Sequence, residues 1–244
     1  MPEDQTDPTQ SGAASGQFHL KVPALVVTLT AITALTLAGI GARLAYRGDF
    51  NLIYTLLILF FAINLVICYW ELCLLIKRDY IERRAEHWKR RWEETGRAPP
   101  VEFLSQAVSL KKWLSLTVWA DVWASYCHVD SSYADRRTYG YSVDVGNGFV
   151  TPVPMLILFA AYTFELLSAT VSGIIGAMLF WQLLYATSVY WFSFFIAKRH
   201  TRISRRDLYI YIFTLNSPWI LFALLGLYVS VRLILENSYA VLGH

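Results

Sequence analysis

Five stretches of this sequence are long and almost free of charged side chains, and they constrain the fold more than any other feature. A helix that crosses a bilayer needs about 20 consecutive, mostly apolar residues. The pattern predicts an all-α fold: a polytopic membrane helical bundle of about five transmembrane helices in one integral membrane domain, residues 22–244. The predicted spans are 22–42, 52–76, 149–169, 174–197 and 208–233.

The charged residues collect between these stretches and make up 16% of the chain, below the roughly one quarter that is usual in soluble domains. Lys and Arg concentrate in the connections after the second and fourth spans. Because such clusters stay on the cytoplasmic side, the amino terminus and both connections are predicted to be cytoplasmic, although Arg43 and Arg47 lie on the other side. Either the endoplasmic reticulum or a bacterial inner membrane fits this topology.

Two regions lie outside the predicted spans. Residues 1–21 are polar and rich in Ser, Thr, Gly and Pro, which predicts a disordered tail. Residues 78–124 predict a cytoplasmic helical insertion. Within it, 79–94 has charges spaced for pairing on one helix, as in a solvated extension or in a surface that docks a partner subunit or a second copy. The stretch 101–124 is amphipathic and predicts a helix at, or partly inside, the membrane interface.

Ionisable and amide side chains are costly inside a bilayer, so those within spans are candidates for function. Asn64, Cys68 and Glu71 are spaced by four and three residues and share one helix face. Asp144, Asn147 and Thr151 share a face if their helix begins before Asp144. The alternative for each is structural: Glu71 can reach a nearby basic residue, and amides such as Gln182 commonly bond between membrane helices. Glu165 and Asn216 complete the set.

The sequence contains no motif typical of metal, nucleotide or nucleophilic chemistry. The three cysteines and five histidines do not have metal-ligand spacing, and there is no phosphate-binding loop or nucleophile elbow. We therefore expect no metal and no cofactor. The net charge of +3 is too small to suggest a nucleic-acid partner. An aromatic, apolar interior with a few polar groups suits a flat apolar ligand such as a sterol or an isoprenoid.

Three segments carry a family resemblance. The motif Trp123-Ala-Ser-Tyr126-Cys-His-Val-Asp130-Ser-Ser-Tyr133 resembles a motif of the emopamil-binding protein family, the sterol Δ8–Δ7 isomerase type with an EXPERA membrane fold. Asn216-Ser-Pro-Trp219 is similar to the last helix of that family. Asn64-Leu-Val-Ile-Cys68-Tyr-Trp70 resembles its His-Leu-Val-Ile-Glu-Gly-Trp, with Asn64 and Cys68 in place of the catalytic His and Glu.

The resemblance implies a cup of helices around a sterol-like ligand, and protonation of an alkene to give a carbocation. Asp144 falls where the family has a Glu in its site. The predicted catalytic residues are Asp144, Glu71 and Asn216. The predicted ligand-binding residues are Trp219, Tyr126, Asp130, Tyr133, Asn64, Cys68, Asn147 and Thr151. The alternatives are a cyclase, a non-catalytic lipid-binding member of the fold, and a structural subunit of a membrane complex.

Overall fold

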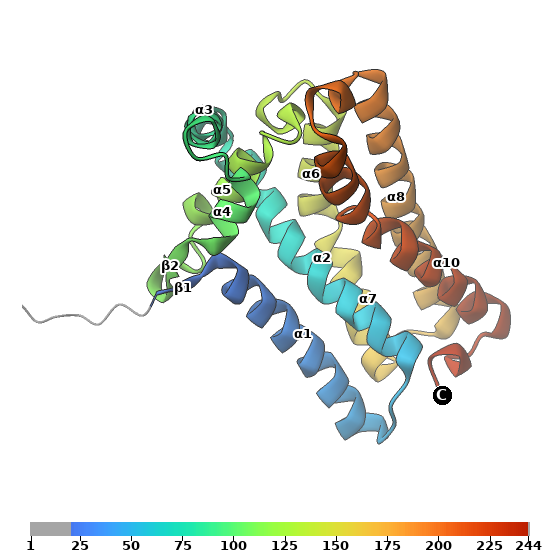
Figure 1. The fold of residues 1–244 in the computed structure, drawn as a ribbon. Coiled ribbons are helices and arrows are strands. Elements are labelled where there is room, and N and C mark those ends of the chain that lie inside the picture. The colour runs from blue at the N-terminus through green and yellow to red at the C-terminus, as the bar shows by residue number, and fades with distance from the viewer. Residues whose placement is uncertain (1–20, 244) are drawn as a thin grey trace, which may run out of the picture.

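The computed structural model describes residues 21–243, and most of this range is helical (Figure 1). The long helices are α1 (Ala24–Arg47), α2 (Leu52–Ile76), α6 (Tyr139–Val150), α7 (Pro152–Phe164), α8 (Ala169–Ile196) and α10 (Pro218–Glu236). Four helical stretches in the described chain are long and apolar enough to cross a membrane, the last being Arg205–Glu236. A fifth is added if α6 and α7, bent by 46°, form one span. The all-α membrane bundle is thus confirmed.

The third predicted span has the wrong boundaries. Its helix begins at Tyr139, ten residues before the predicted start, and bends where Pro152 opens α7. Proline ends a regular helix because it lacks the backbone N–H and its ring crowds the preceding turn. The helix then stops at Phe164, so the turn to α8 lies at 165–168 and not at 170–173. Glu165 consequently caps α7 in a left-handed conformation and forms an ion pair with Arg47, outside the helix that was predicted to contain it.

The insertion after α2 is less regular than predicted. Its helices are α3 (Arg78–Thr95), α4 (Pro99–Ser105) and α5 (Leu116–Tyr126), so 101–124 is not one helix. Between α4 and α5 lies β2 (Ala107–Ser109), which pairs antiparallel with β1 (Lys21–Pro23). The first span therefore starts at Ala24, and Val22 belongs to a strand. The predicted tail lies outside the described residues except for Lys21.

Charged side chains of α3 form ion pairs with neighbouring helices. Arg84 pairs with Asp121 of α5 at 2.9 Å, and Arg91 pairs with Glu102 of α4. Trp88 is fully buried on the same side and donates its indole N–H to Asp121. One face of α3 is thus packed against α4 and α5, and these pairs reach other helices, whereas the sequence pattern suggested pairs along α3 itself.

Short elements complete the chain: η1 (Leu110–Lys112), η2 (Ser131–Ala134), η3 (Arg199–Arg202), α9 (Arg205–Asp207), the π-helical η4 (Leu208–Thr214) and η5 (Ala240–Leu242). In Figure 1 the insertion and the α8–α10 connection lie at one end of the bundle. The α1–α2 turn and the carboxyl-terminal residues lie at the other. Arg43, 1% exposed, joins these two segments by bonding both Asp49 and the Leu242 carbonyl.

Helices α8 and α10 pack closely because small residues face each other. A Cβ added to Gly226 would lie 2.4 Å from three carbons of the Phe180 ring. We expect Gly226→Ala to destabilise the protein by about 1–3 kcal/mol, the usual effect of overpacking. Gly41→Ala is the matched control, since a Cβ added there would meet no atom of residues 21–243 within 4 Å apart from the backbone of its own helix. Thermal unfolding in detergent measures the difference, and equal midpoints would contradict this account of the contact.

Candidate functional site

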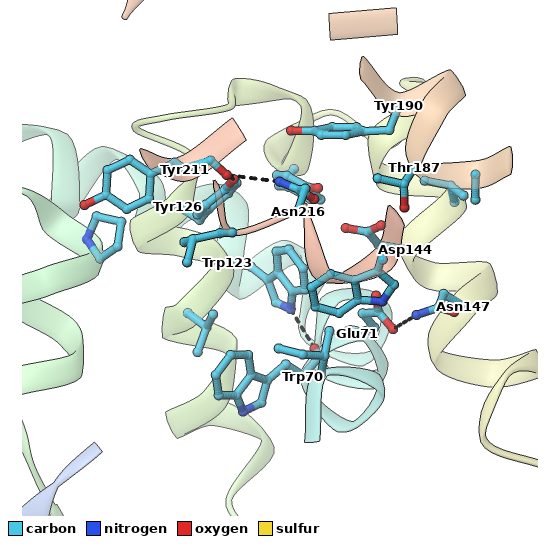
Figure 2. Close-up of a pocket in the computed structure, with 18 of the residues that line it drawn as sticks. Trp70, Glu71, Trp123, Tyr126, Asp144, Asn147, Thr187, Tyr190, Tyr211 and Asn216 are labelled. Carbon is cyan, nitrogen blue, oxygen red and sulfur yellow. Dashed lines mark hydrogen bonds between the residues drawn. The ribbon is translucent and has the colours of Figure 1, made fainter. Parts of the chain in front are cut away.

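A cavity of about 570 Å³ lies among α2, α4, α5, α6, α8 and the segment that leads into α10. Aromatic side chains form much of its wall, and Figure 2 shows Trp70, Trp123, Tyr126, Tyr190 and Tyr211 among them. Tyr133 and Trp219 also line the cavity. The indole N–H of Trp123 donates to the Trp70 carbonyl at 2.7 Å, which holds the α5 wall against α2. The cavity is therefore mainly apolar and rigidly framed.

Two carboxyl groups from different helices line this cavity, Glu71 from α2 and Asp144 from α6. Glu71 is 3% exposed, and its Oε2 accepts a hydrogen bond from Asn147 Nδ2 at 2.7 Å. Asp144 lies one turn before Asn147 and interacts with Tyr133. Neither carboxyl takes part in an ion pair among residues 21–243. Glu71 thus does not pair with the basic end of its helix.

A glycine allows Glu71 to lie so close to α6. A Cβ added at Gly148 would lie 2.7 Å from Glu71 Cβ and 3.0 Å from backbone atoms of α2. The helices meet at this point because Gly148 has no side chain, and the contact brings Asn147 within reach of Glu71.

The Glu71–Asn147 contact continues as a chain of hydrogen bonds. Thr151 Oγ1 donates to Asn147 Oδ1 at 2.5 Å, and Gln182 Nε2 of α8 donates to Thr151 Oγ1 at 3.2 Å. Thr151 is fully buried at the bend between α6 and α7 and does not line the cavity, whereas Gln182 does. The chain connects four polar side chains from three parts of the bundle.

Asn64 and Cys68 share a helix face with Glu71, as predicted, but they do not line the cavity. Asn64 accepts a hydrogen bond from the Trp219 indole N–H at 2.6 Å. Its Nδ2 lies 3.4 Å from Cys68 Sγ and 3.5 Å from Met155 Sδ. Asn64 therefore acts on the cavity indirectly, by orienting Trp219.

Asn216 lies in a break in the last helical stretch, between η4 and α10. Pro218 has no N–H to offer the Thr214 carbonyl, and the Ser217 hydroxyl donates to that carbonyl instead, at 2.8 Å. Asn216 Nδ2 donates to the carbonyls of Tyr211 and Ile212, both at 3.0 Å. The predicted span 208–233 is thus not a continuous helix. These two hydrogen bonds from Asn216 hold the backbone of this break, and Asn216 lines the cavity beside it.

Asp130 lies outside the cavity wall and is 0% exposed. Its carboxylate accepts from Arg199 Nη1 at 2.9 and 3.0 Å and from the Tyr190 hydroxyl at 2.9 Å. The Ser132 N–H also donates to it. Asp130 therefore contributes to the cavity by holding the hydroxyl of Tyr190, and Tyr190 does line the cavity.

The cavity brings together seven of the eleven predicted site residues: Glu71, Tyr126, Tyr133, Asp144, Asn147, Asn216 and Trp219. Asn64, Cys68, Asp130 and Thr151 lie behind the wall. The sequence interpretation did not include Trp70, Thr187, Tyr190 and Tyr211, which line the cavity, or Arg199, which holds Asp130. The pairing of Arg199 with Asp130 was not predicted from the sequence. Arg199 belongs to a run of basic residues, and this run was interpreted only as evidence for the orientation in the membrane.

His128 follows α5 and is the histidine within the Trp123–Tyr133 motif. Its ring packs against Trp92, with the centroids 4.4 Å apart, and burial lowers the pKa of its imidazole. His128 does not line the cavity. Among the described residues, no group of three His, Cys, Asp or Glu side chains could hold a metal ion.

Comparison with known proteins gives no further guide: no protein-family model, no curated protein and no solved structure matches this chain.

Proposed function

We propose that this protein binds a flat, mostly apolar lipid, a sterol or an isoprenoid, and rearranges it by cofactor-free acid–base chemistry at Glu71 and Asp144. The closest reaction type is the shift of a double bond through a carbocation, with cyclisation as the related alternative. The observation that carries the proposal is that one aromatic cavity holds two carboxyl groups that form no ion pair with any residue of 21–243.

The size and lining of the cavity support a lipid ligand. Its volume of about 570 Å³ falls within the roughly 300–1,000 Å³ typical of small-molecule sites. The faces of Trp70, Trp123 and Trp219 suit a flat ring system. Aromatic faces also attract a cation through their quadrupole, which favours a carbocation without forming a bond to it.

The positions of the carboxyls support acid–base chemistry. Moving a double bond needs a proton donor at one carbon and a proton acceptor at another. Glu71 of α2 and Asp144 of α6 line the same cavity, so a ligand inside it would meet both groups. In the proposed step, one carboxyl protonates the alkene and the other takes a proton from a neighbouring carbon. Atoms and charge balance without an added reagent.

The proposal also accounts for the departures from the emopamil-binding family. The positions of its His and Glu hold Asn64 and Cys68, and both side chains here lie behind the cavity wall. Glu71 lies three residues after Cys68, on the same helix face. We propose that the acid has moved along α2 to Glu71 within an otherwise similar cup.

For the membrane topology, we propose that both basic connections face the cytoplasm. The insertion and the α8–α10 connection hold far more Lys and Arg than the opposite end, where Arg43 and Arg47 lie. The positive-inside signal counts Lys and Arg, so it favours the side that holds these two basic connections.

Mass spectrometry of lipids that copurify with the protein tests the ligand class. A sterol or an isoprenoid is expected at a near-stoichiometric level. Ala186→Trp, which fills the α8 wall of the cavity, should abolish it. Met178→Trp is the matched control, since Met178 is on the same helix, is 70% exposed and does not line the cavity. Recovery of bulk phospholipid alone, equal in all three proteins, would overturn the proposal.

A binding protein without catalysis is the second candidate. It is favoured by the replacement of the family's acid pair by Asn64 and Cys68, which hold Trp219 in place. This candidate keeps the bound lipid and predicts that it is recovered unchanged.

A further inference from the structure

We infer that Asn147, Thr151 and Gln182 are positioning residues: they form a one-way hydrogen-bond chain that keeps the transferable proton of Glu71 on Oε1. This inference deepens the function proposed above and rests on it for its catalytic meaning. The orientation itself can be measured without any turnover.

The direction of the chain follows from the donor and acceptor capacity of each group. An amide nitrogen only donates, so Thr151 Oγ1 accepts from Gln182 Nε2. A threonine hydroxyl has one hydrogen, and this one goes to Asn147 Oδ1, which only accepts. Asn147 must then present Nδ2 to Glu71 Oε2. Each bond sets the direction of the next, and all of them point toward Glu71.

The consequence for Glu71 is an asymmetric carboxyl group. When the acid is protonated, it has one hydrogen for its two oxygens. Oε2 already faces an N–H donor at 2.7 Å, so a hydrogen placed there would meet another hydrogen. The proton is therefore on Oε1, and Oε2 is the carbonyl oxygen. The other ionisable groups that influence Glu71 are Asp144 and the weakly donating Cys68 thiol.

One member of the chain acts without contact with the ligand. Thr151 is fully buried at the α6–α7 bend and has no access to the cavity. Its hydroxyl nonetheless determines that Asn147 directs Nδ2, and not Oδ1, toward Glu71. An acid whose donor oxygen is already fixed does not have to be oriented when the ligand binds. Orientation matters because a misplacement of about 1 Å can lower a reaction rate on the order of 100-fold.

Infrared spectroscopy of Thr151→Val and Thr151→Ser tests the inference. The carboxyl C=O band of Glu71 is identified by its loss in Glu71→Gln, in samples taken across a pH series. Thr151→Val keeps the shape but removes the hydroxyl, so Asn147 is no longer held and the bond to Oε2 weakens. The band should move to higher frequency in Thr151→Val and stay in place in Thr151→Ser. Thr28→Val, where a buried hydroxyl donates to the Ala24 carbonyl of its own helix, is the matched control.

Turnover gives the second readout, with a Δ8-unsaturated sterol as the probe. Thr151→Val should lower kcat by on the order of 10-fold with KM nearly unchanged, and Thr151→Ser should restore it. An unmoved band in Thr151→Val, or a move to lower frequency, would overturn the inference. If the native protein turns over no lipid, the proposed function fails, and the band still tests the hydrogen-bond chain.

Discussion

Replacing Glu71 with glutamine is expected to lower turnover by about 10²–10⁴-fold while lipid still binds. Glutamine keeps the size of the side chain and can still meet Asn147, but it cannot deliver a proton to an alkene. Asp144→Asn should behave in the same way, because the second carboxyl is needed for the opposite proton transfer. The measurement is conversion of a Δ8-unsaturated sterol, and of any copurifying lipid, by protein in detergent.

Two further measurements make this result decisive. Glu236→Gln, at the exposed end of α10, is the control and should retain full turnover. Lipid retention, measured by mass spectrometry, should be equal in all variants. Full activity of both Glu71→Gln and Asp144→Asn would rule out the acid–base proposal. A native protein that holds its lipid without converting it would instead establish the binding-only function.

Replacing Arg199 with methionine is expected to destabilise the protein by about 3–5 kcal/mol, because it leaves a buried carboxylate without its cation. Asp130 is 0% exposed and takes two of its hydrogen bonds from Arg199. The double variant Asp130→Asn with Arg199→Met should recover part of the loss, since an amide needs no counter-charge. The unfolding midpoint in detergent measures both.

Arg202→Met provides the comparison, since Arg202 is in the same short helix and is exposed. It should unfold at the native midpoint. If Arg199→Met were as stable as Arg202→Met, the Asp130–Arg199 pair would not be a structural support of the cavity. The same experiment bears on Tyr190, because Asp130 holds its hydroxyl at 2.9 Å.

Hydropathy predicted the spans well where a helix is apolar along its whole length. The second span was expected at 52–76, and α2 covers Leu52–Ile76. The third span was misplaced because α6 contains Asp144 and Asn147, which face a cavity inside the bundle and not lipid. A one-dimensional pattern cannot separate a polar cavity wall from a loop. The pairing of β1 with β2 was also missed, since strands of three residues have no periodic signal.

The candidate site was predictable to a similar extent. Spacing placed Asn64, Cys68 and Glu71 on one face of α2, and the structure agrees. Spacing did not reveal where along that face the cavity opens, because this depends on the neighbouring helix. Gly148 determines this position, because its lack of a side chain lets α6 approach α2 at Glu71. Asp130 was grouped with ligand-binding residues because it shares a motif with Tyr126 and Tyr133, whereas its partner Arg199 is 69 residues away.

The pairing of β1 with β2 also determines which part of the protein a force applied at β1 would act on. Lys21–Pro23 pair with the strand that follows α4, and the Ala24 N–H itself bonds to the Gln106 carbonyl at 2.9 Å. Because α4 supplies Pro100, Val101 and Leu104 to the cavity wall, a force applied at β1 acts on that wall. The carboxyl-terminal segment lies at the opposite end of the bundle (Figure 1), and Arg43 anchors it through the Leu242 carbonyl; neither of these two residues lines the cavity. A purification tag therefore belongs at the carboxyl terminus, and a reporter of ligand entry belongs on β1.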